Sequence, residues 1–86
     1  MGKSPDKIWE ELLRHQRNVR FKDFCRVIEW FGFDKKGGKG SHLTYYLSGV
    51  REILDVQSFG SEAKPYQIKQ LINVVKLYGL KGGKNA

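Results

Sequence analysis

The sequence predicts an α+β fold in which two helices precede three antiparallel strands and a final helix. Residues 20–31 repeat apolar side chains at three- and four-residue spacing, which is the pattern of a helix with one buried face. Residues 43–47 alternate apolar and polar side chains, as a strand with one buried face does. Residues 65–78 begin with a proline and return to helical spacing. Because short strands joined by tight turns pair antiparallel, the expected order is α-β-β-β-α with an extra N-terminal helix.

The first two helices are each predicted from an apolar stripe. Residues 4–15 are expected to form the N-terminal helix, with Ser4 as N-cap and Pro5 in the first turn. Its apolar stripe consists of Ile8, Trp9, Leu12 and Leu13. The second helix, residues 20–31, should end before Gly32 and bury Phe21, Phe24, Cys25, Ile28 and Phe31. Trp30 lies off that stripe, so it covers an edge or faces a partner.

The three strands are expected to form one antiparallel sheet with one covered face and one open face. Phe33 begins the first strand, which gives way to a turn of glycines and lysines. In the second strand Leu43, Tyr45 and Leu47 point one way, and His42, Thr44, Tyr46 and Ser48 point the other. A hairpin turn at residues 48–49 leads to a third strand, residues 51–57, with Leu54 and Val56 inward. Residues 58–64 are expected to be a loop.

The last helix begins at Pro65 and is expected to end at Gly79. Its core stripe consists of Ile68, Leu71, Ile72, Val75 and Tyr78. Residues 81–86 are expected to form a flexible basic tail. At 86 residues the chain 1–86 is expected to be a single domain, with its core in residues 18–80.

The charge of the chain is strongly basic and unevenly distributed. Sixteen Lys and Arg residues against nine Asp and Glu residues give a net charge of +7. Residues 64–86 contain five lysines and no acidic residue. A basic excess concentrated in one segment indicates a polyanionic partner, for which nucleic acid is the first expectation, although solubility alone also explains it.

Composition excludes several other classes of protein. Cys25 is the single cysteine, so no internal disulfide and no metal site is expected, and its place on an apolar stripe makes it a core residue. No apolar run approaches the roughly 20 residues that span a bilayer, and the N-terminus lacks the apolar region of a secretory signal. We therefore expect a cytoplasmic protein with no cofactor and no membrane partner.

The candidate site surrounds His42, where the basic turn meets the second strand. Histidine can act as acid or base near neutral pH, and RNA supplies its own nucleophile in the neighbouring 2′-hydroxyl, so cleavage requires no metal. Lys39, Lys35 or Lys36 can stabilise negative charge on the phosphate, the glycines including Gly40 admit close backbone contact, and Ser41 can donate a hydrogen bond. From the residues alone, a solvent-facing histidine beside lysines is most often a surface residue, and a phosphate contact or a catalytic base are the alternatives for His42; His15 is interpreted as a surface residue.

Three segments resemble the HicA family of bacterial toxins. They are Gly40-Ser41-His42 after a helix ending in Gly-Phe and a basic turn, the stretch Lys64-Pro65-Tyr66-Gln67-Ile68-Lys69-Gln70, and the helix entry Asn18-Val19-Arg20-Phe21. The resemblance covers roughly residues 18–80. It implies the fold of a double-stranded-RNA-binding domain and the activity of a small mRNA interferase that a HicB antitoxin holds inactive.

The resemblance also assigns roles within the site. It maps the catalytic histidine of the family onto His42, with Gly40 and Ser41 matching its flanking residues. The phosphate contact of Lys39 is inferred from its charge and position and is not part of the family motif. The RNA-binding residues are expected to be Lys36, Lys39, Gly40, Ser41, Lys64 and Lys69. The N-terminal helix departs from the shortest family members and is expected to pack on the core or contact the partner.

Three hypotheses follow from these observations. The first is a metal-independent ribonuclease toxin in which His42 is general acid or base. The second is a non-catalytic RNA-binding module that recognises A-form RNA through phosphates and 2′-hydroxyls. The third is a protein-interaction domain whose positive charge binds an acidic partner, with Trp30, Tyr46 and the C-terminal lysines as contacts.

Overall fold

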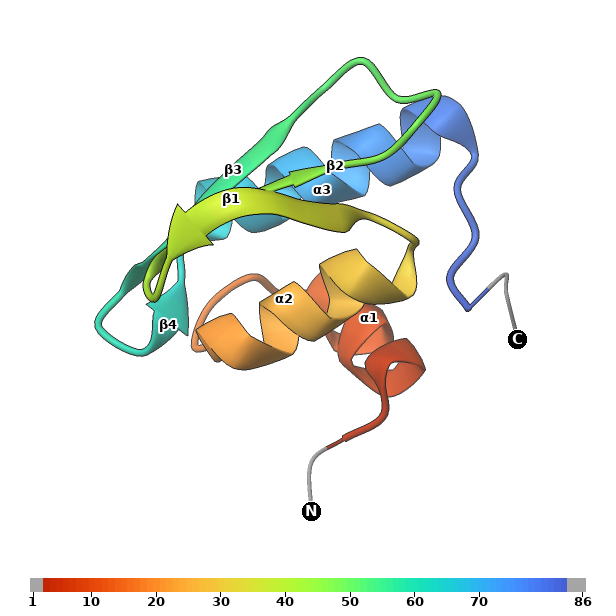
Figure 1. Cartoon of the computed structure of the whole chain (residues 1–86). Coiled ribbons are helices and arrows are strands. Elements are labelled where there is room, and N and C mark those ends of the chain that lie inside the picture. The colour runs from red at the N-terminus through yellow and green to blue at the C-terminus, as the bar shows by residue number, and fades with distance from the viewer. Residues whose placement is uncertain (1–2, 84–86) are drawn as a thin grey trace.

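The computed structural model describes residues 3–83 and has three helices and one sheet. In chain order the elements are α1 (Pro5–Arg14), α2 (Phe21–Trp30), β1 (Asp34–Lys39), β2 (His42–Tyr46), β3 (Leu54–Phe59), β4 (Glu62–Ala63) and α3 (Pro65–Tyr78). The strands pair antiparallel in the order β1-β2-β3-β4. Figure 1 shows α1 and α2 side by side and α3 running behind the strands. The predicted α+β class is confirmed.

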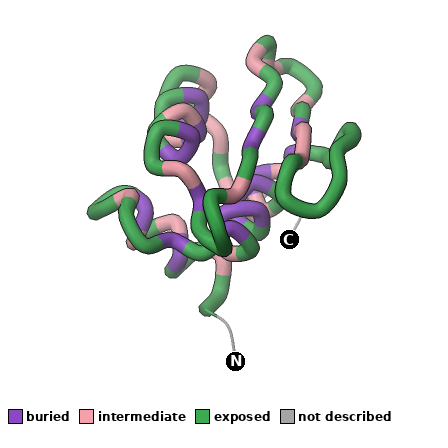
Figure 2. The backbone as a smooth tube through the Cα atoms, turned by 90° about the vertical axis from the view of Figure 1, so that its left-hand side faces the viewer, coloured by how far each residue is buried: buried purple, intermediate pink, exposed green. Residues whose placement is uncertain are grey.

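A single buried cluster joins the helices to one face of the sheet. It includes the inward side chains Tyr45, Leu54 and Val56 together with side chains from all three helices. Buried and exposed positions follow one another along β3 (Figure 2). Because successive side chains of a strand point to opposite faces, burying one set leaves the other set on an open face.

The predicted helices are confirmed, with small errors at their boundaries. All five residues predicted for the buried stripe of α2 are buried. Ser4 is the N-cap residue of α1, and Gly79 ends α3 with a left-handed φ of 62°, a conformation that glycine adopts without strain. The stripe of α1 was predicted too wide, because Leu13 is exposed while Ile8 and Leu12 are buried. None of the helices within residues 3–83 has the length and apolar content to cross a membrane.

The predicted three-stranded sheet is wrong in its strand count, because the expected loop 58–64 contains the end of β3 and the short strand β4. The outer side of β4 pairs with the connector that precedes α2. The N–H of Ala63 donates to the carbonyl of Val19 at 2.8 Å, and the N–H of Phe21 donates to the carbonyl of Ser61 at 2.9 Å. These partners lie some forty residues away in the chain, so local sequence gives no sign of them.

The predicted turn of glycines and lysines is also wrong, because residues 34–39 are strand β1 itself. The true turn is Gly40 and Ser41, and a bulge between Lys35 and Gly37 leaves Lys36 without a partner on β2. All six residues of β1 are exposed, so only backbone pairing defines this strand. Lysines on an edge strand oppose pairing with further strands.

The segment between β2 and β3 is longer than predicted. A turn forms at residues 48–49 as expected, where the N–H of Val50 donates to the carbonyl of Leu47 at 3.0 Å. The third strand begins only at Leu54 rather than at residue 51, and Ile53 lies exposed in the loop before it. The hydroxyl of Tyr78 binds this loop to α3 by donating to Glu52 at 2.7 Å.

The chain after α3 returns to α2 instead of forming the predicted flexible tail over residues 81–83. The N–H of Gly83 donates to the carbonyl of Trp30 at 2.8 Å. A Cβ on Gly82 would lie 2.2 Å from the indole ring, so only glycine permits this contact. Trp30 therefore covers an edge of the core, which is the first of the two roles predicted for it. The remaining tail residues, 84–86, lie outside the described residues.

Tyr45 is the central buried side chain of β2. Its ring is 0% exposed, and its hydroxyl donates to the carboxylate of Glu29 on α2 at 2.7 Å. Burial, followed by this hydrogen bond, raises the pKa of Tyr45 far above its ordinary value of 10.0. The pair fixes β2 against α2 and so determines which face of β2 is open.

Alanine at Gly38 is expected to disrupt the β1–β2 hairpin. Gly38 has a φ of +107°, and an added Cβ would lie 2.1 Å from the carbonyl oxygen of His42, a backbone atom with no room to move. We expect Gly38→Ala to lower the free energy of unfolding by at least about 2 kcal/mol, measured by urea titration. Gly37→Ala is the matched control, because nothing lies within 4 Å of its added Cβ. Equal stability of the two variants would contradict this account.

Replacement of Tyr45 by phenylalanine should change both stability and its pH dependence. Because the folded-state pKa of Tyr45 is raised, its contribution to stability is complete below pH 10 and is lost as pH rises above that value. Tyr45→Phe should therefore be less stable at pH 7 by about 1–2 kcal/mol and should lose stability less steeply above pH 10. Urea titrations from pH 7 to 11 measure both, with Tyr66→Phe, which changes an exposed ring, as control. A variant that matches wild type throughout would show that the hydroxyl contributes nothing.

Candidate functional site

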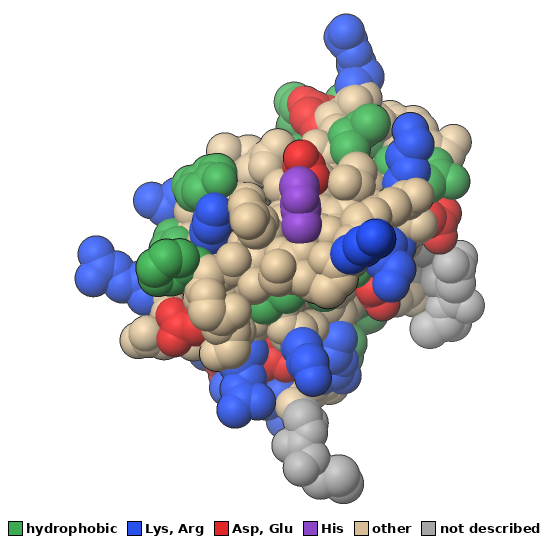
Figure 3. Space-filling view, turned by 60° about the vertical axis from the view of Figure 1, so that its left-hand side comes forward, with side chains coloured by type: hydrophobic (Ala, Val, Ile, Leu, Met, Phe, Trp, Pro, Cys, Tyr) green, Lys and Arg blue, Asp and Glu red, His purple; other side chains and the backbone are tan. Residues whose placement is uncertain are grey.

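The outward positions of β2 and β3 form an open face that none of the described helices covers. His42 and Thr44 of β2 and Asp55 and Gln57 of β3 all point to this side, opposite the buried Tyr45. Figure 3 shows a histidine at the centre of this view, with an acidic side chain beside it and basic and hydrophobic side chains around it. The sheet therefore presents a polar, solvent-accessible surface, as the alternation of β2 predicted.

His42 is held by a carboxylate that the sequence analysis did not identify. Its Nε2 atom lies 2.7 Å from Oδ1 of Asp55, and the hydroxyl of Thr44 donates to the same oxygen at 3.1 Å. Thr44 is directly opposite Asp55 in the β2–β3 pairing, so Asp55 reaches His42 along the diagonal. The side chains of His42 and Asp55 remain 56% and 62% exposed, so a large substrate can reach both.

The contact with Asp55 determines which ring nitrogen is available. A carboxylate only accepts hydrogen bonds, so Nε2 carries the proton in the neutral ring and Nδ1 holds the free lone pair. Among the described residues, Nδ1 of His42 has no hydrogen-bond partner. The free nitrogen is thus presented to solvent on the open face, where it can accept a proton from a bound molecule.

The end of the β1–β2 hairpin places positive charge beside His42. Lys39 is directly opposite His42 in the strand pairing. Gly40 and Ser41 form the turn between them, and the carbonyl of Ser41 accepts a hydrogen bond from the N–H of Ser58 at 2.8 Å. Lys39, Gly40, Ser41 and His42, which are consecutive in the chain, thus lie at this end of the hairpin.

The turn also borders a hollow of about 500 Å³. Its lining combines basic, hydroxyl and glycine residues: Arg20, Lys22, Gly40, Ser41, Ser58, Gly60 and Ser61, together with the ring of Phe21. Arg20 and Lys22 come from the start of α2, far from the turn in sequence. They add positive charge that the sequence analysis did not assign to the site.

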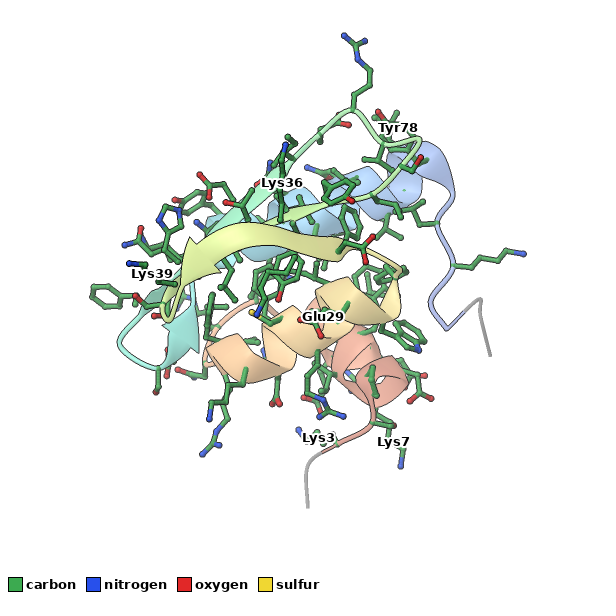
Figure 4. All side chains as sticks on the ribbon, viewed as in Figure 1. Lys3, Lys7, Glu29, Lys36, Lys39 and Tyr78 are labelled. Carbon is green, nitrogen blue, oxygen red and sulfur yellow. The ribbon has the colours of Figure 1, made fainter. Side chains whose placement is uncertain are left out.

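The other predicted lysines are more scattered. Lys64, directly before α3, donates to the side chain of Gln57 at 3.4 Å, and Gln57 is opposite His42, so Lys64 borders the open face. Lys69 lies on α3 in a different hollow beside Glu52. Lys36 and Lys39 point in different directions from β1 in Figure 4. The structure thus groups Lys39 and Lys64 with His42 but leaves Lys36 and Lys69 apart.

One signal could have identified Asp55 in the sequence. It lies between two apolar residues of the third strand, Leu54 and Val56, so the alternation already placed it outward. Its neighbour across the sheet depends on the register of β2 and β3, which the intervening loop determines. Within residues 3–83, no three His, Cys, Asp or Glu side chains are grouped in a way that could hold a metal ion.

The comparison with protein families identifies the chain. The family model described as the HicA toxin of bacterial toxin-antitoxin systems matches residues 21–77, from the start of α2 nearly to the end of α3. The matched segment contains the open face, His42 and Asp55, while α1 lies outside it. No curated protein and no solved structure matches the chain. Because the family model covers well over half of the sequence, the chain belongs to the HicA family of bacterial toxins.

Proposed function

We propose that this toxin is a metal-independent endoribonuclease that cleaves mRNA with His42 as its catalytic residue. The observation that supports this most directly is the hydrogen-bonded pair of His42 and Asp55 on an open face bordered by cations. The pair supplies a base, and the open face admits a long polymer. The family match supplies the toxin assignment.

The proposed reaction uses the substrate's own 2′-hydroxyl. Nδ1 of His42 takes the proton of that hydroxyl, and the 2′-oxygen forms a bond to the adjacent phosphorus. The bond from phosphorus to the 5′-oxygen breaks, and this leaving oxygen takes a proton from the imidazolium, or from a water molecule whose hydroxide then takes the proton of the imidazolium. The products are a 2′,3′-cyclic phosphate and a 5′-hydroxyl, and the protein is returned to its starting charge.

The neighbouring residues support this step in distinct ways. Asp55 orients the ring and stabilises the imidazolium that forms, while Thr44 orients Asp55. Lys39, opposite His42, stabilises the extra negative charge on the phosphate. Gly40 and Ser41 position the RNA backbone through the turn.

The remaining lysines act farther from the reacting phosphate. Lys64 holds the RNA backbone beside Gln57. Lys36 and Lys69 lie apart from this group, so their part is limited to long-range attraction of RNA.

The proposed inhibitor is a HicB-type antitoxin. A protein that covers the open face with acidic side chains would both neutralise Lys39 and exclude RNA from His42. The fold of a double-stranded-RNA-binding domain and the cytoplasmic location both stay predictions. Both agree with an mRNA substrate and a HicB-type inhibitor.

A non-catalytic RNA-binding module is the second candidate. The exposure of the His42–Asp55 pair favours it, because water weakens electrostatic interactions at an open site. In that case the same cations bind RNA and His42 is one contact among several. The two candidates differ in whether removal of His42 stops cleavage or only weakens binding.

The first test is substitution of His42. We expect induced wild-type protein to arrest growth and fragment mRNA. Purified protein should cleave mRNA even in the presence of EDTA, which removes divalent metal ions. His42→Ala should reduce the cleavage rate by about 10²–10⁴-fold, the usual contribution of a general base, while binding RNA nearly as tightly. His15→Ala is the matched control, because His15 lies on the far end of α1 and should leave cleavage unchanged. Cleavage by His42→Ala at the wild-type rate would reject His42 as the catalytic residue, whereas wild-type protein that binds RNA without cleaving it would favour the binding module.

The second test concerns Asp55. Asp55→Asn should lower kcat by about two- to fivefold with little change in KM, a modest effect because the pair is exposed to solvent. Nitrogen NMR of the His42 ring should show Nε2 protonated in wild type and a mixture of tautomers in the variant. Thr44→Val should show a smaller change of the same kind. An unaltered tautomer in Asp55→Asn would show that the carboxylate does not orient the ring.

A further inference from the structure

We propose that Phe59 and Tyr66, flanked by Lys64 and Arg17, form a base-stacking subsite that holds an unpaired nucleobase of the RNA beside His42. The inference rests on the proposed function and specifies its substrate as single-stranded RNA. It follows from the position, exposure and charge of these residues, each of which is independent of the chemistry at His42.

The position of Phe59 follows from the geometry of β3. Asp55, Gln57 and Phe59 are alternate residues of this strand, so all three side chains point to the open face. Gln57 is directly opposite His42. Phe59 is two residues farther along, which is roughly 7 Å at the usual rise of a strand. A nucleotide adjoining the phosphate at His42 would therefore reach the ring of Phe59.

The two aromatic side chains are exposed to an unusual degree. Phe59 is 78% exposed and Tyr66 is 65% exposed, although a protein of this size has little apolar surface to spare for water. Phe59 ends β3 at a two-residue turn and faces Glu62 in the β3–β4 pairing. A polar side chain would serve that turn equally well, because the core at β4 is filled by Ala63 instead. The fold therefore gives no reason for an aromatic ring at position 59.

Both rings line one hollow of about 460 Å³. The rest of its lining comes from the connector before α2, from β4 and from the start of α3: Arg17, Asn18, Glu62, Ala63, Lys64 and Pro65. Tyr66 and Phe59 come from different elements and approach each other only in the folded chain. Planar walls and an open mouth suit a flat ring.

The charges around the hollow suit a nucleotide. Lys64 donates to Gln57 at 3.4 Å, so its ammonium group lies between the hollow and the residue opposite His42. A backbone phosphate between the two sites would meet this cation, and Arg17 is a second cation at the rim. Glu62 is the one acidic residue of the lining, and it disfavours a phosphate inside the hollow itself. The occupant that fits is an uncharged base on a charged backbone.

This arrangement selects unpaired RNA. Bases within an A-form duplex are stacked on their neighbours and cannot reach an aromatic side chain, whereas bases of single strands and loops can. Stacking on aromatic rings is tolerant of sequence, because every base has a π-face. The subsite would thus direct the toxin to single-stranded stretches of mRNA without selecting one base.

The test is binding of a single-stranded oligoribonucleotide with 2′-O-methyl groups, which cannot be cleaved, compared with the same sequence as a duplex. Phe59→Ala and Tyr66→Ala should each weaken single-strand binding by about 5- to 150-fold, the measured range for loss of a stacked base. Phe59→Trp should restore binding. Leu13→Ala is the matched control, because Leu13 is 47% exposed on α1 and lines neither this hollow nor the neighbouring one on α3 that Tyr66 also borders, and it should bind as wild type does.

Salt dependence separates stacking from charge. The slope of log affinity against log salt concentration should be unchanged in Phe59→Ala and should fall by about one unit in Lys64→Ala. Circular dichroism and urea titration of each variant establish that it is folded. Duplex binding should be equal in wild type and in the two aromatic variants.

Three results would overturn the inference. If both aromatic variants bind single-stranded RNA as wild type does while wild type cleaves mRNA, the subsite is wrong and the proposed function stands. If the variants lose only their inhibition by the antitoxin, the surface is a protein interface. If wild type neither binds nor cleaves RNA, the subsite and the proposed function both fail.

Discussion

The structure depends on the one-sided burial of strand β2. Tyr45 is enclosed by the core and bound through its hydroxyl to Glu29 on α2, so β2 cannot shift by one residue without exposing that ring and burying His42. The orientation of His42 toward solvent is therefore secured by the side chain that points in the opposite direction.

The open face gives the proposed site its chemical character. His42 and Asp55 are both more than half exposed, so their mutual attraction is weakened by water and the site relies on orientation rather than on a low dielectric. Such a site suits a polymer that cannot enter a deep pocket, and it also suits control by a partner that simply covers it. Lys39 on one side and Lys64 on the other place cations at both ends of the path that an RNA backbone would follow past His42.

The sequence predicted the elements that have strong periodicity and failed where pairing is purely a matter of backbone. The buried residues of α2 and the inward-facing Tyr45 of β2 were predicted correctly, because the spacing of apolar residues shows which face of an element is buried. Residues 34–39 have no apolar stripe, and their glycines suggested a turn, yet they form β1 because β2 supplies backbone partners. Strand β4 was missed for the same reason, since its outer partner is the connector at Val19.

The sequence by itself determined the α+β class, the open position of His42 and the grouping of Lys39, Gly40 and Ser41 beside it, because these follow from local alternation and chain adjacency. Only the tertiary structure decided that Asp55 binds His42, that Lys64 borders the same face, and that Phe59 and Tyr66 line one hollow. These contacts join β2 to β3, and β3 to the start of α3. The lengths of the intervening loops do not determine which residues of the two strands pair. Register is set by the packing of the whole core, which no short stretch of sequence contains.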